Sequence, residues 1–326
     1  MTLPANAMQW SIGLVGYGEV GRILAEDLRA RGVETVLACD IKLGGPEEAP
    51  LLEHAAKLGV WLTASHAELA SRADLVISAV TASQTIPVAE ACAPTLRKGV
   101  WFLDINSASP GGKIKAAACV MAAGGRFVEG AVMTSVPPYR IRVPMLLGGP
   151  DAAVLAPSLS AFGFEGRVSA AKIGVVSASK MCRSVMIKGL EAMVIESFTA
   201  ARAYGVEKQV LASLAETFPG IDWEKQGAYF FQRVIQHGRR RAEEMREAAQ
   251  TVREAGLEPW SAAGTAARQA WVADLAERGL FGDGNASRKD WRADADKILA
   301  ASNPSFPRKR ESTTTDKDAG SPLSRG

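Results

Sequence analysis

The sequence predicts a two-domain protein of the α/β class: a Rossmann-type, doubly wound sheet domain, then an all-α domain and a disordered C-terminal tail. Three observations lead to this prediction. Short apolar runs alternate with helix-like segments in the first half, a glycine-rich turn directly follows the first run, and the strand-like runs stop near mid-chain. Such alternation is typical of a parallel sheet covered by helices on both faces. The expected boundaries are 10–170 for the sheet domain, 171–301 for the helical domain and 302–326 for the tail.

Six apolar runs are the expected strands of the first domain. Most are continuous rather than alternating, as strands buried on both faces of a parallel sheet are. They are SIGLV (11–15), TVLACD (35–40), DLVISAV (74–80), VWFLDI (100–105), RFVEGAV (126–132) and PMLLGG (144–149). Between them lie helix-forming stretches such as 19–32, and Ser109 before Pro110 is a typical helix start.

The second domain has the composition of helices alone. Residues 176–204 predict one long helix, and 206–216, 222–256 and 259–279 predict three more, separated by glycine- and proline-containing breaks. The last 25 residues contain, besides prolines, only Phe306, Ala319 and Leu323 as apolar residues. A segment this poor in apolar residues cannot build a core, so we expect it to be disordered.

The composition excludes several classes of protein. With 326 residues, 47% of them hydrophobic, the chain is long enough for two domains with a core each. The net charge of +3 is too small for a nucleic-acid surface, and no apolar run reaches the roughly 18 residues needed to cross a bilayer. Four scattered cysteines and three histidines without ligand-like spacing predict no disulfide scaffold and no metal site. No secretory signal is visible at the start, so we expect a cytoplasmic protein without nucleic-acid or membrane partners.

The strongest chemical signal is the turn Gly16-Tyr17-Gly18-Glu19-Val20-Gly21, between the first expected strand and a helix. The first glycine permits a tight turn, the second lets the backbone approach a pyrophosphate, and the third lets the helix pack on the strand. The N–H groups at the start of the helix then face the anion. All six residues are therefore candidate cofactor ligands; the alternative is an ordinary turn.

An acidic residue, Asp40, follows 19 positions after Gly21, at the end of the next expected strand. A carboxylate there accepts hydrogen bonds from the adenosine ribose and repels a 2′-phosphate, which favours NAD over NADP. Lys42, two residues on, partly offsets that repulsion, so NADP stays the less favoured alternative. Asp40 as a simple strand-end cap is the structural alternative.

Two further strand ends are expected to line the cofactor crevice, because ligands of open α/β sheets bind at the carboxyl ends of the strands. One is Val80-Thr81-Ala82 and the other is Asp104-Ile105-Asn106-Ser107. Taken alone, each is also what an ordinary polar strand end looks like.

The expected long helix carries a polar stripe of Lys180, Ser184, Lys188 and Glu191, which fall within an arc of about 80°. One interpretation is a solvated face with Lys188 and Glu191 as a surface ion pair. The other is that the stripe faces the nicotinamide cleft. There, a lysine crowded by Arg183 and Lys188 and partly desolvated has a lowered pKa, which suits proton transfer to and from an alcohol oxygen.

These segments resemble the β-hydroxyacid dehydrogenase and 6-phosphogluconate dehydrogenase superfamily over roughly residues 11–280. The matching segments, in family order, are IGLVGYGEVG, DINSASP (104–110), EGAVMTSVPP (129–138) and KMCRS (180–184). KMCRSVMIKGLEA and HGRRRAEEM (237–245) look most like a phosphogluconate-dehydrogenase-like branch with a distinctive C-terminal domain.

The resemblance implies that Lys180 is the general acid/base and that Gly16, Gly18, Gly21, Asp40, Val80, Thr81 and Asn106 hold the dinucleotide. It also places substrate-contacting positions at Thr134, Ser135 and Ser184. There the chain departs from the family, whose substrate loop reads Ser-Gly-Gly and whose helix carries Asn instead of Ser184. Lys188 and His237 are further candidates. His237 and the following arginines are expected either to bind an anionic substrate or to form a charged surface helix.

The expected function is an NAD(P)-dependent dehydrogenase that acts on a small, anionic hydroxy acid and forms a homodimer through its helical domain. Two alternatives remain. Imine reductases resemble this superfamily but usually carry Asp or Tyr where Lys180 stands. A non-catalytic dinucleotide sensor would keep the fingerprint and lose the chemistry.

Overall fold

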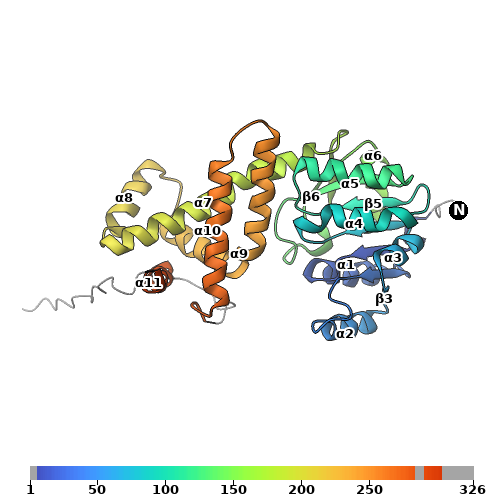
Figure 1. The fold of residues 1–326 in the computed structure, drawn as a ribbon, viewed down its shortest axis with the longest axis horizontal. Coiled ribbons are helices and arrows are strands. Elements are labelled where there is room, and N and C mark those ends of the chain that lie inside the picture. Colours follow the sequence, from blue (N-terminus) through green and yellow to red (C-terminus); the bar gives the residue numbers. More distant parts are fainter. Residues whose placement is uncertain (1–5, 283–289, 303–326) are drawn as a thin grey trace, which may run out of the picture.

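The computed structural model describes residues 6–282 and 290–302 and has the predicted fold class (Figure 1). A mostly parallel sheet with helices occupies the first half, and the C-terminal half is helical. The expected tail, 302–326, lies outside the described residues apart from Ser302, which ends the last helix. Within the described ranges, no helix is both long and apolar enough to cross a bilayer.

Eight strands form one sheet in the order β3-β2-β1-β4-β5-β6-β7-β8. They are β1 (Ile12–Val15), β2 (Val36–Cys39), β3 (Trp61–Leu62), β4 (Leu75–Ser78), β5 (Trp101–Asp104), β6 (Arg126–Val132), β7 (Met145–Gly148) and β8 (Gly166–Ala170). All neighbouring pairs are parallel except β6 with β7. The chain reverses its direction across the sheet between β1 and β4, and such a switch point opens a crevice at the carboxyl ends of the strands.

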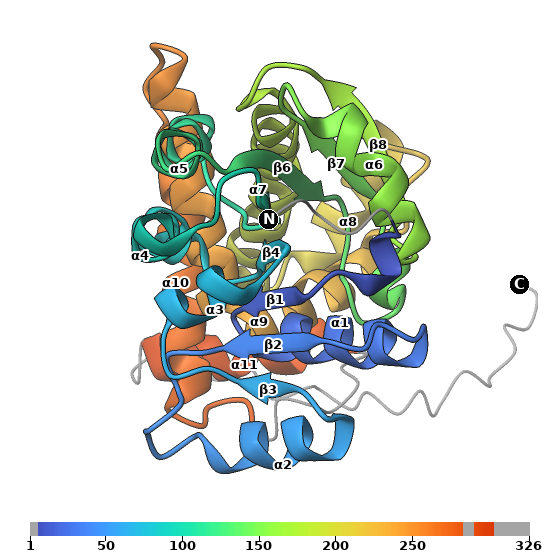
Figure 2. The ribbon, with the colours of Figure 1, turned by 90° about the vertical axis from the view of Figure 1, so that its right-hand side faces the viewer.

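Six helices cover the two faces of the sheet (Figure 2). They are α1 (Glu19–Ala30), α2 (Ala49–Leu58), α3 (His66–Arg72), α4 (Thr85–Cys92), α5 (Pro110–Ala122) and α6 (Ala152–Ala161). Apolar residues of α1, α2 and α6 form one core with the sheet, and those of α3, α4 and α5 form a second core on the other face. The continuous apolar runs in the sequence reflect this burial on both sides.

The helical half consists of α7 (Val175–Tyr204), α8 (Glu207–Thr217), α9 (Trp223–Glu254), α10 (Trp260–Glu277) and α11 (Trp291–Ser302). Helix α7 has 30 residues and runs from the sheet domain through the helical domain (Figure 1). A third core, rich in phenylalanine and tryptophan, joins α7, α9, α10 and α11. The sequence did not predict β3, β8 or α11.

The two halves are joined where α9 passes the start of α5. The carboxylate of Glu247 accepts a 2.7 Å hydrogen bond from the backbone N–H of Ser109. Two helical turns further along the same face of α9, Glu254 accepts a 2.8 Å bond from the N–H of Gly111. Negative groups stabilise a helix N-terminus, so α9 is held against the first turn of α5, next to the carboxyl end of β5.

Candidate active site

The three glycines of the motif occupy distinct positions: Gly16 and Gly18 lie in the loop between β1 and α1, and Gly21 lies in the first turn of α1. Gly16 has a φ of +91°, and a Cβ there would clash with the carbonyl oxygen of Ala79. A Cβ on Gly21 would clash with the carbonyl oxygen of Gly16, so α1 packs directly on the loop. Gly18 faces open space, and no side chain of residues 6–282 or 290–302 caps the start of α1 behind it. Free N–H groups at a positive helix end suit a pyrophosphate, so the loop fits a dinucleotide.

The other residues of the loop differ in exposure. Glu19 is exposed and Val20 is half-buried. The Tyr17 side chain is fully buried and its hydroxyl lies 2.8 Å from Nδ1 of His54, so the ring belongs to the core. Burial raises the pKa of Tyr17 to about 12. Tyr17 therefore offers no side-chain group to a cofactor, and its backbone N–H is bonded to Asp40.

Asp40 follows β2 at the mouth of the same crevice. Its carboxylate accepts backbone N–H groups from Tyr17 (2.7 Å) and Lys42 (3.0 Å). The Lys42 ammonium is paired with Glu47 and does not bond to Asp40. A cavity of about 280 Å³ lies beside the carboxylate, lined by Cys39, Asp40, Ile41, Leu43, Ala64, Ser65 and His66. A negative group next to a partly apolar hollow suits the adenosine end of a dinucleotide.

The two other predicted strand ends lie side by side because β4 pairs with β5. The side chain of Asn106 is buried and joins them: its Oδ1 accepts the N–H of Val80 (2.7 Å), and its Nδ2 donates to Oγ of Ser78 (2.9 Å). Thr81 is exposed at the edge of the crevice. Asn106 thus sets the shape of this edge.

Lys180 lies on α7, where the helix passes the carboxyl end of β5. Its Nζ donates a 2.6 Å hydrogen bond to Oγ of Ser107, and the residue is half-buried. Burial lowers the pKa of Lys180 to about 8, from a usual value of 10.5. Glu244 opposes this shift, whereas the charges of Lys188, Lys113 and Arg240 add to it.

The sequence predicted a lowered pKa for Lys180 and attributed it to burial, Arg183 and Lys188. Burial and Lys188 are among the main causes, whereas Arg183 is exposed and is not among them. Lys113 contributes instead: it is fully buried beneath the end of β5 and bonds through Nζ to the carbonyl oxygen (2.9 Å) and Oδ1 (2.8 Å) of Asp104.

A buried carboxylate fixes the start of the lysine helix. Glu129 of β6 is fully buried and accepts the backbone N–H groups of Gly174 (2.8 Å) and Val176 (3.3 Å) and the hydroxyl of Ser177 (2.7 Å). Ser177 lies one turn before Lys180 on the same helix. Glu129 therefore holds α7 to the sheet close to the point at which Lys180 leaves the helix.

The interpretation of Lys188 and Glu191 as a solvated surface pair is wrong, because both residues are buried. Nζ of Lys188 lies 2.8 Å from Oε2 of Glu244 and donates to Oγ of Ser184 (3.1 Å). Glu191 instead forms a buried ion pair with Arg241. The polar stripe of α7 thus faces α9 and the sheet domain.

Glu244 of α9 forms ion pairs with Lys188 and, more weakly, with Arg240. Burial by itself raises its pKa, but the charges of Lys188, Lys180 and Arg240 outweigh burial and lower the pKa to about 2. Glu244 is therefore ionised at neutral pH and compensates part of the positive charge around Lys180.

In the described part of the chain, no hydrogen bond or ion pair joins Lys180 to the remaining predicted residues, Thr134, Ser135 and His237. Thr134 is exposed and Ser135 half-buried in the loop after β6, at the same edge of the sheet, and neither side chain forms a hydrogen bond within residues 6–282 and 290–302. His237 is half-buried on α9, where burial and the charges of Arg233, Arg240 and Arg241 lower its pKa to about 4.

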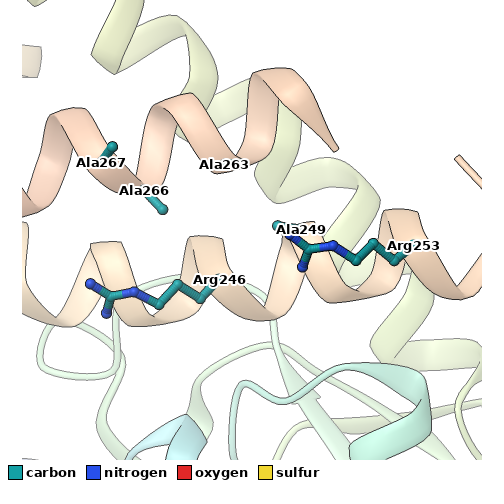
Figure 3. Close-up of a pocket in the computed structure, with 6 residues that line it drawn as sticks. All are labelled: Arg246, Ala249, Arg253, Ala263, Ala266 and Ala267. Carbon is teal, nitrogen blue, oxygen red and sulfur yellow. The ribbon is translucent and has the colours of Figure 1, made fainter. Parts of the chain in front are cut away.

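A second hollow of about 280 Å³ lies between α9 and α10 (Figure 3). It is lined by Arg246, Ala249, Arg253, Ala263, Ala266 and Ala267. No predicted site residue lines it.

Four residues of the site were not predicted as site residues: Ser107, Lys113, Glu129 and Glu244. Ser107 directly follows Asn106 in a predicted strand end, and this position in the sequence could have indicated that it belongs to the site. Lys113, in the first turn of α5, and Glu244, among arginines, look like surface residues in the sequence. Glu129 lies within an expected strand, where nothing in the sequence showed its contact with the start of α7. The burial of these residues becomes visible only in the fold.

The two halves of the chain match two different families of known proteins. Residues 11–108 match the family described as NADP oxidoreductase, coenzyme F420-dependent. Residues 201–272 match a domain of unknown function, DUF1932. The first match covers the glycine-rich loop and both strand ends, and the second covers α8, α9 and most of α10.

Individual relatives match almost over their whole length. An uncharacterized 28.5 kDa protein of Methanothermus fervidus is 31% identical over 251 residues, which are 76% of this chain and 93% of the relative. The structure of a conserved hypothetical protein from Sinorhizobium meliloti is 35% identical, with a TM-score of 0.70 over 89% of this chain and 96% of that chain. A conserved protein of unknown function, described as structurally similar to 3-hydroxyacid dehydrogenases, is 29% identical, with a TM-score of 0.63 over 82% and 99% of the two chains.

Proposed function

Because the chain belongs to the β-hydroxyacid and 6-phosphogluconate dehydrogenase-like superfamily, with a distinct C-terminal domain, we propose that it is a nicotinamide-dependent dehydrogenase of small hydroxy acids. Lys180 is its general acid/base. The observation that carries the proposal is the position of the Lys180 amine, bonded to Ser107 at the carboxyl end of β5. That end borders the crevice formed by the glycine-rich loop.

The nicotinamide ring, when bound, accepts the hydride that leaves the alcohol carbon. In oxidation, neutral Lys180 takes the proton of the substrate hydroxyl while the C–H bond breaks and the C=O bond forms. In reduction, protonated Lys180 returns this proton to the developing alkoxide. A pKa of about 8 keeps both protonation states of Lys180 accessible near neutral pH. Ser107 holds the amine by a hydrogen bond at the point where the proton moves.

We propose NAD as the cofactor. Gly16, Gly18 and Gly21 would hold the pyrophosphate. Asp40 would accept hydrogen bonds from the ribose hydroxyls and repel a 2′-phosphate. The pairing of Lys42 with Glu47 supports this preference, because it directs the nearest lysine away from Asp40. The family description of the N-terminal domain names NADP, so NADP is the alternative to be measured.

A panel of hydroxy acids, assayed with NAD and with NADP by the absorbance of the reduced cofactor, tests the function. Turnover of an acid supports the proposal. Tight NADH binding without turnover of any acid would favour a dinucleotide sensor. Turnover of cyclic imines alone would favour an imine reductase, against which the lysine at position 180 argues.

Two copies of the chain are proposed to associate through the helical domain. Met186 and Met193 lie seven residues apart on α7, and 73% and 61% of their surfaces are exposed. Residues at this spacing share a helix face, and exposed apolar faces often mark contacts between proteins. Analytical ultracentrifugation of wild type and of Met186→Glu tests the association: a monomeric wild type would contradict it.

A further inference from the structure

Three consecutive arginines of α9 point in three different directions. Arg239 lies on the outer surface and pairs with Asp274 (2.6 Å) and Glu277 (2.8 Å) of α10. Arg241 is buried and pairs with Glu191 of α7. Both guanidinium groups are therefore neutralised by carboxylates.

Arg240 differs from its two neighbours. In the described part of the chain, its one ion pair is with Glu244, at 3.6 Å between Nη1 and Oε1, and 52% of its side chain is exposed. Glu244 is already bound through its other oxygen to Lys188, at 2.8 Å. A contact of 3.6 Å is too long for a good hydrogen bond, so the donors of Arg240 stay available.

Arg240 lies beside the proposed reaction centre. Glu247, on the same face of α9, accepts the N–H of Ser109, and Ser107, two residues earlier, accepts the hydrogen bond of Lys180. Arg240 lies seven residues before Glu247, which is two helical turns, or about 10 Å along α9. The Arg240 guanidinium lies 3.6 Å from Glu244, whose charge acts on Lys180 as well. The charge of Arg240 also acts on Lys180, whose pKa it helps to lower.

We infer that Arg240 binds the carboxylate of the substrate through its guanidinium group. This inference rests on the proposed function and adds the residue that selects an acid over a neutral alcohol. A guanidinium fork matches the two oxygens of a carboxylate, and a carboxylate would also replace the weak contact with Glu244 by a stronger one. Lys180 cannot serve both roles, because its amine is needed at the hydroxyl. In the loop after β6, Thr134 and Ser135 offer no charge.

The test compares wild type, Arg240→Ala, Arg240→Lys and the matched control Arg239→Ala. Each is assayed with the hydroxy acid found in the panel and with its primary amide, which lacks the charge. We expect Arg240→Ala to raise KM for the acid by about ten- to a hundredfold, the effect of losing a charge-assisted pair of hydrogen bonds. KM for the amide stays unchanged, Arg240→Lys recovers part of the loss, and Arg239→Ala behaves as wild type. Equal effects on acid and amide, or on the two alanine variants, would overturn the inference.

A binding measurement separates this inference from the proposed function. Malonate, an unreactive dicarboxylate, is titrated by calorimetry into the NADH-loaded proteins. We expect wild type and Arg239→Ala to bind it equally and Arg240→Ala to bind at least about tenfold more weakly. Malonate binding that depends on Arg240, without turnover of any hydroxy acid, would contradict the function but support the carboxylate site. A wild type that does not bind malonate would overturn the site.

Discussion

Nζ of Lys180 and Oγ of Ser107, 73 residues apart in sequence, are joined by a 2.6 Å hydrogen bond across the junction of the two domains. Lys180 comes from the helix that leads into the helical domain, and Ser107 comes from the edge of the sheet that borders the dinucleotide crevice. An amine at this place can reach a hydroxyl group positioned at the crevice.

Replacement of Lys180 by alanine should lower kcat by at least about a hundredfold, the lower end of general acid–base contributions. NADH affinity should stay the same, since the glycine-rich loop lies in another part of the chain. Lys180→Arg should recover little, because a guanidinium stays protonated and cannot act as a base. Stopped-flow turnover and NADH fluorescence measure the two quantities, with the exposed Arg183→Ala as control. Turnover within a few-fold of wild type would move the role to Lys188 or His237.

The rate of alcohol oxidation should increase with pH through about 8. Oxidation needs neutral Lys180, whose pKa is lowered from 10.5 to about 8 mainly by burial. At pH 7 about a tenth of the lysine is then neutral, compared with about one in a few thousand for an unperturbed lysine. Ketone reduction needs the protonated form, so its rate should fall through the same pH range. Profiles of kcat in both directions check this, and a midpoint near 10.5 would contradict it.

Replacement of Asp40 should change the cofactor preference. Asp40→Ala should weaken NAD binding and improve NADP binding, because the carboxylate that repels a 2′-phosphate is gone. Asp40→Asn keeps an oxygen that can accept the N–H of Tyr17, so it separates the loss of charge from a disturbed loop. Dissociation constants for NADH and NADPH are the measurement, with the exposed Glu34→Gln as control. An unchanged ratio would show that Asp40 does not reach the ribose.

Glu129→Gln should destabilise the protein by about 1–3 kcal/mol, because a neutral amide replaces the buried carboxylate, and hydrogen bonds to a charged group are the stronger ones. The buried carboxylate now accepts three hydrogen bonds at the start of α7. Chemical denaturation measures the loss, and the exposed Glu165→Gln, whose ion pair with Arg142 is solvated, should change stability little. If Glu129 also positions Lys180, kcat should fall while KM for NADH stays constant. Equal stability of the two variants would contradict the capping role.

The sheet domain was largely predictable because its signals are local. The glycine-rich loop, the strand before it and the helix after it are contiguous, so their spacing alone shows the turn that Gly16 and Gly21 require. The missed strands had no such signal. Strand β3 has two residues, and β8 reads Gly-Arg-Val-Ser-Ala and is mostly exposed. A segment that is too short or too polar does not show the pattern of apolar residues by which a strand is recognised.

The sequence by itself determined the order of the elements, the loop geometry and the helix that carries Lys180, because backbone preference and apolar periodicity act over a few neighbouring residues. Only the tertiary structure decided which charges meet. Glu191 lies one turn from Lys188 in sequence, yet it pairs with Arg241, and Lys188 pairs with Glu244. These pairs form because the packing of α9 on α7 buries the stripe, and a buried charge must find a partner in the space around it. The pKa of Lys180 depends on the same burial, which residue spacing along one helix does not encode.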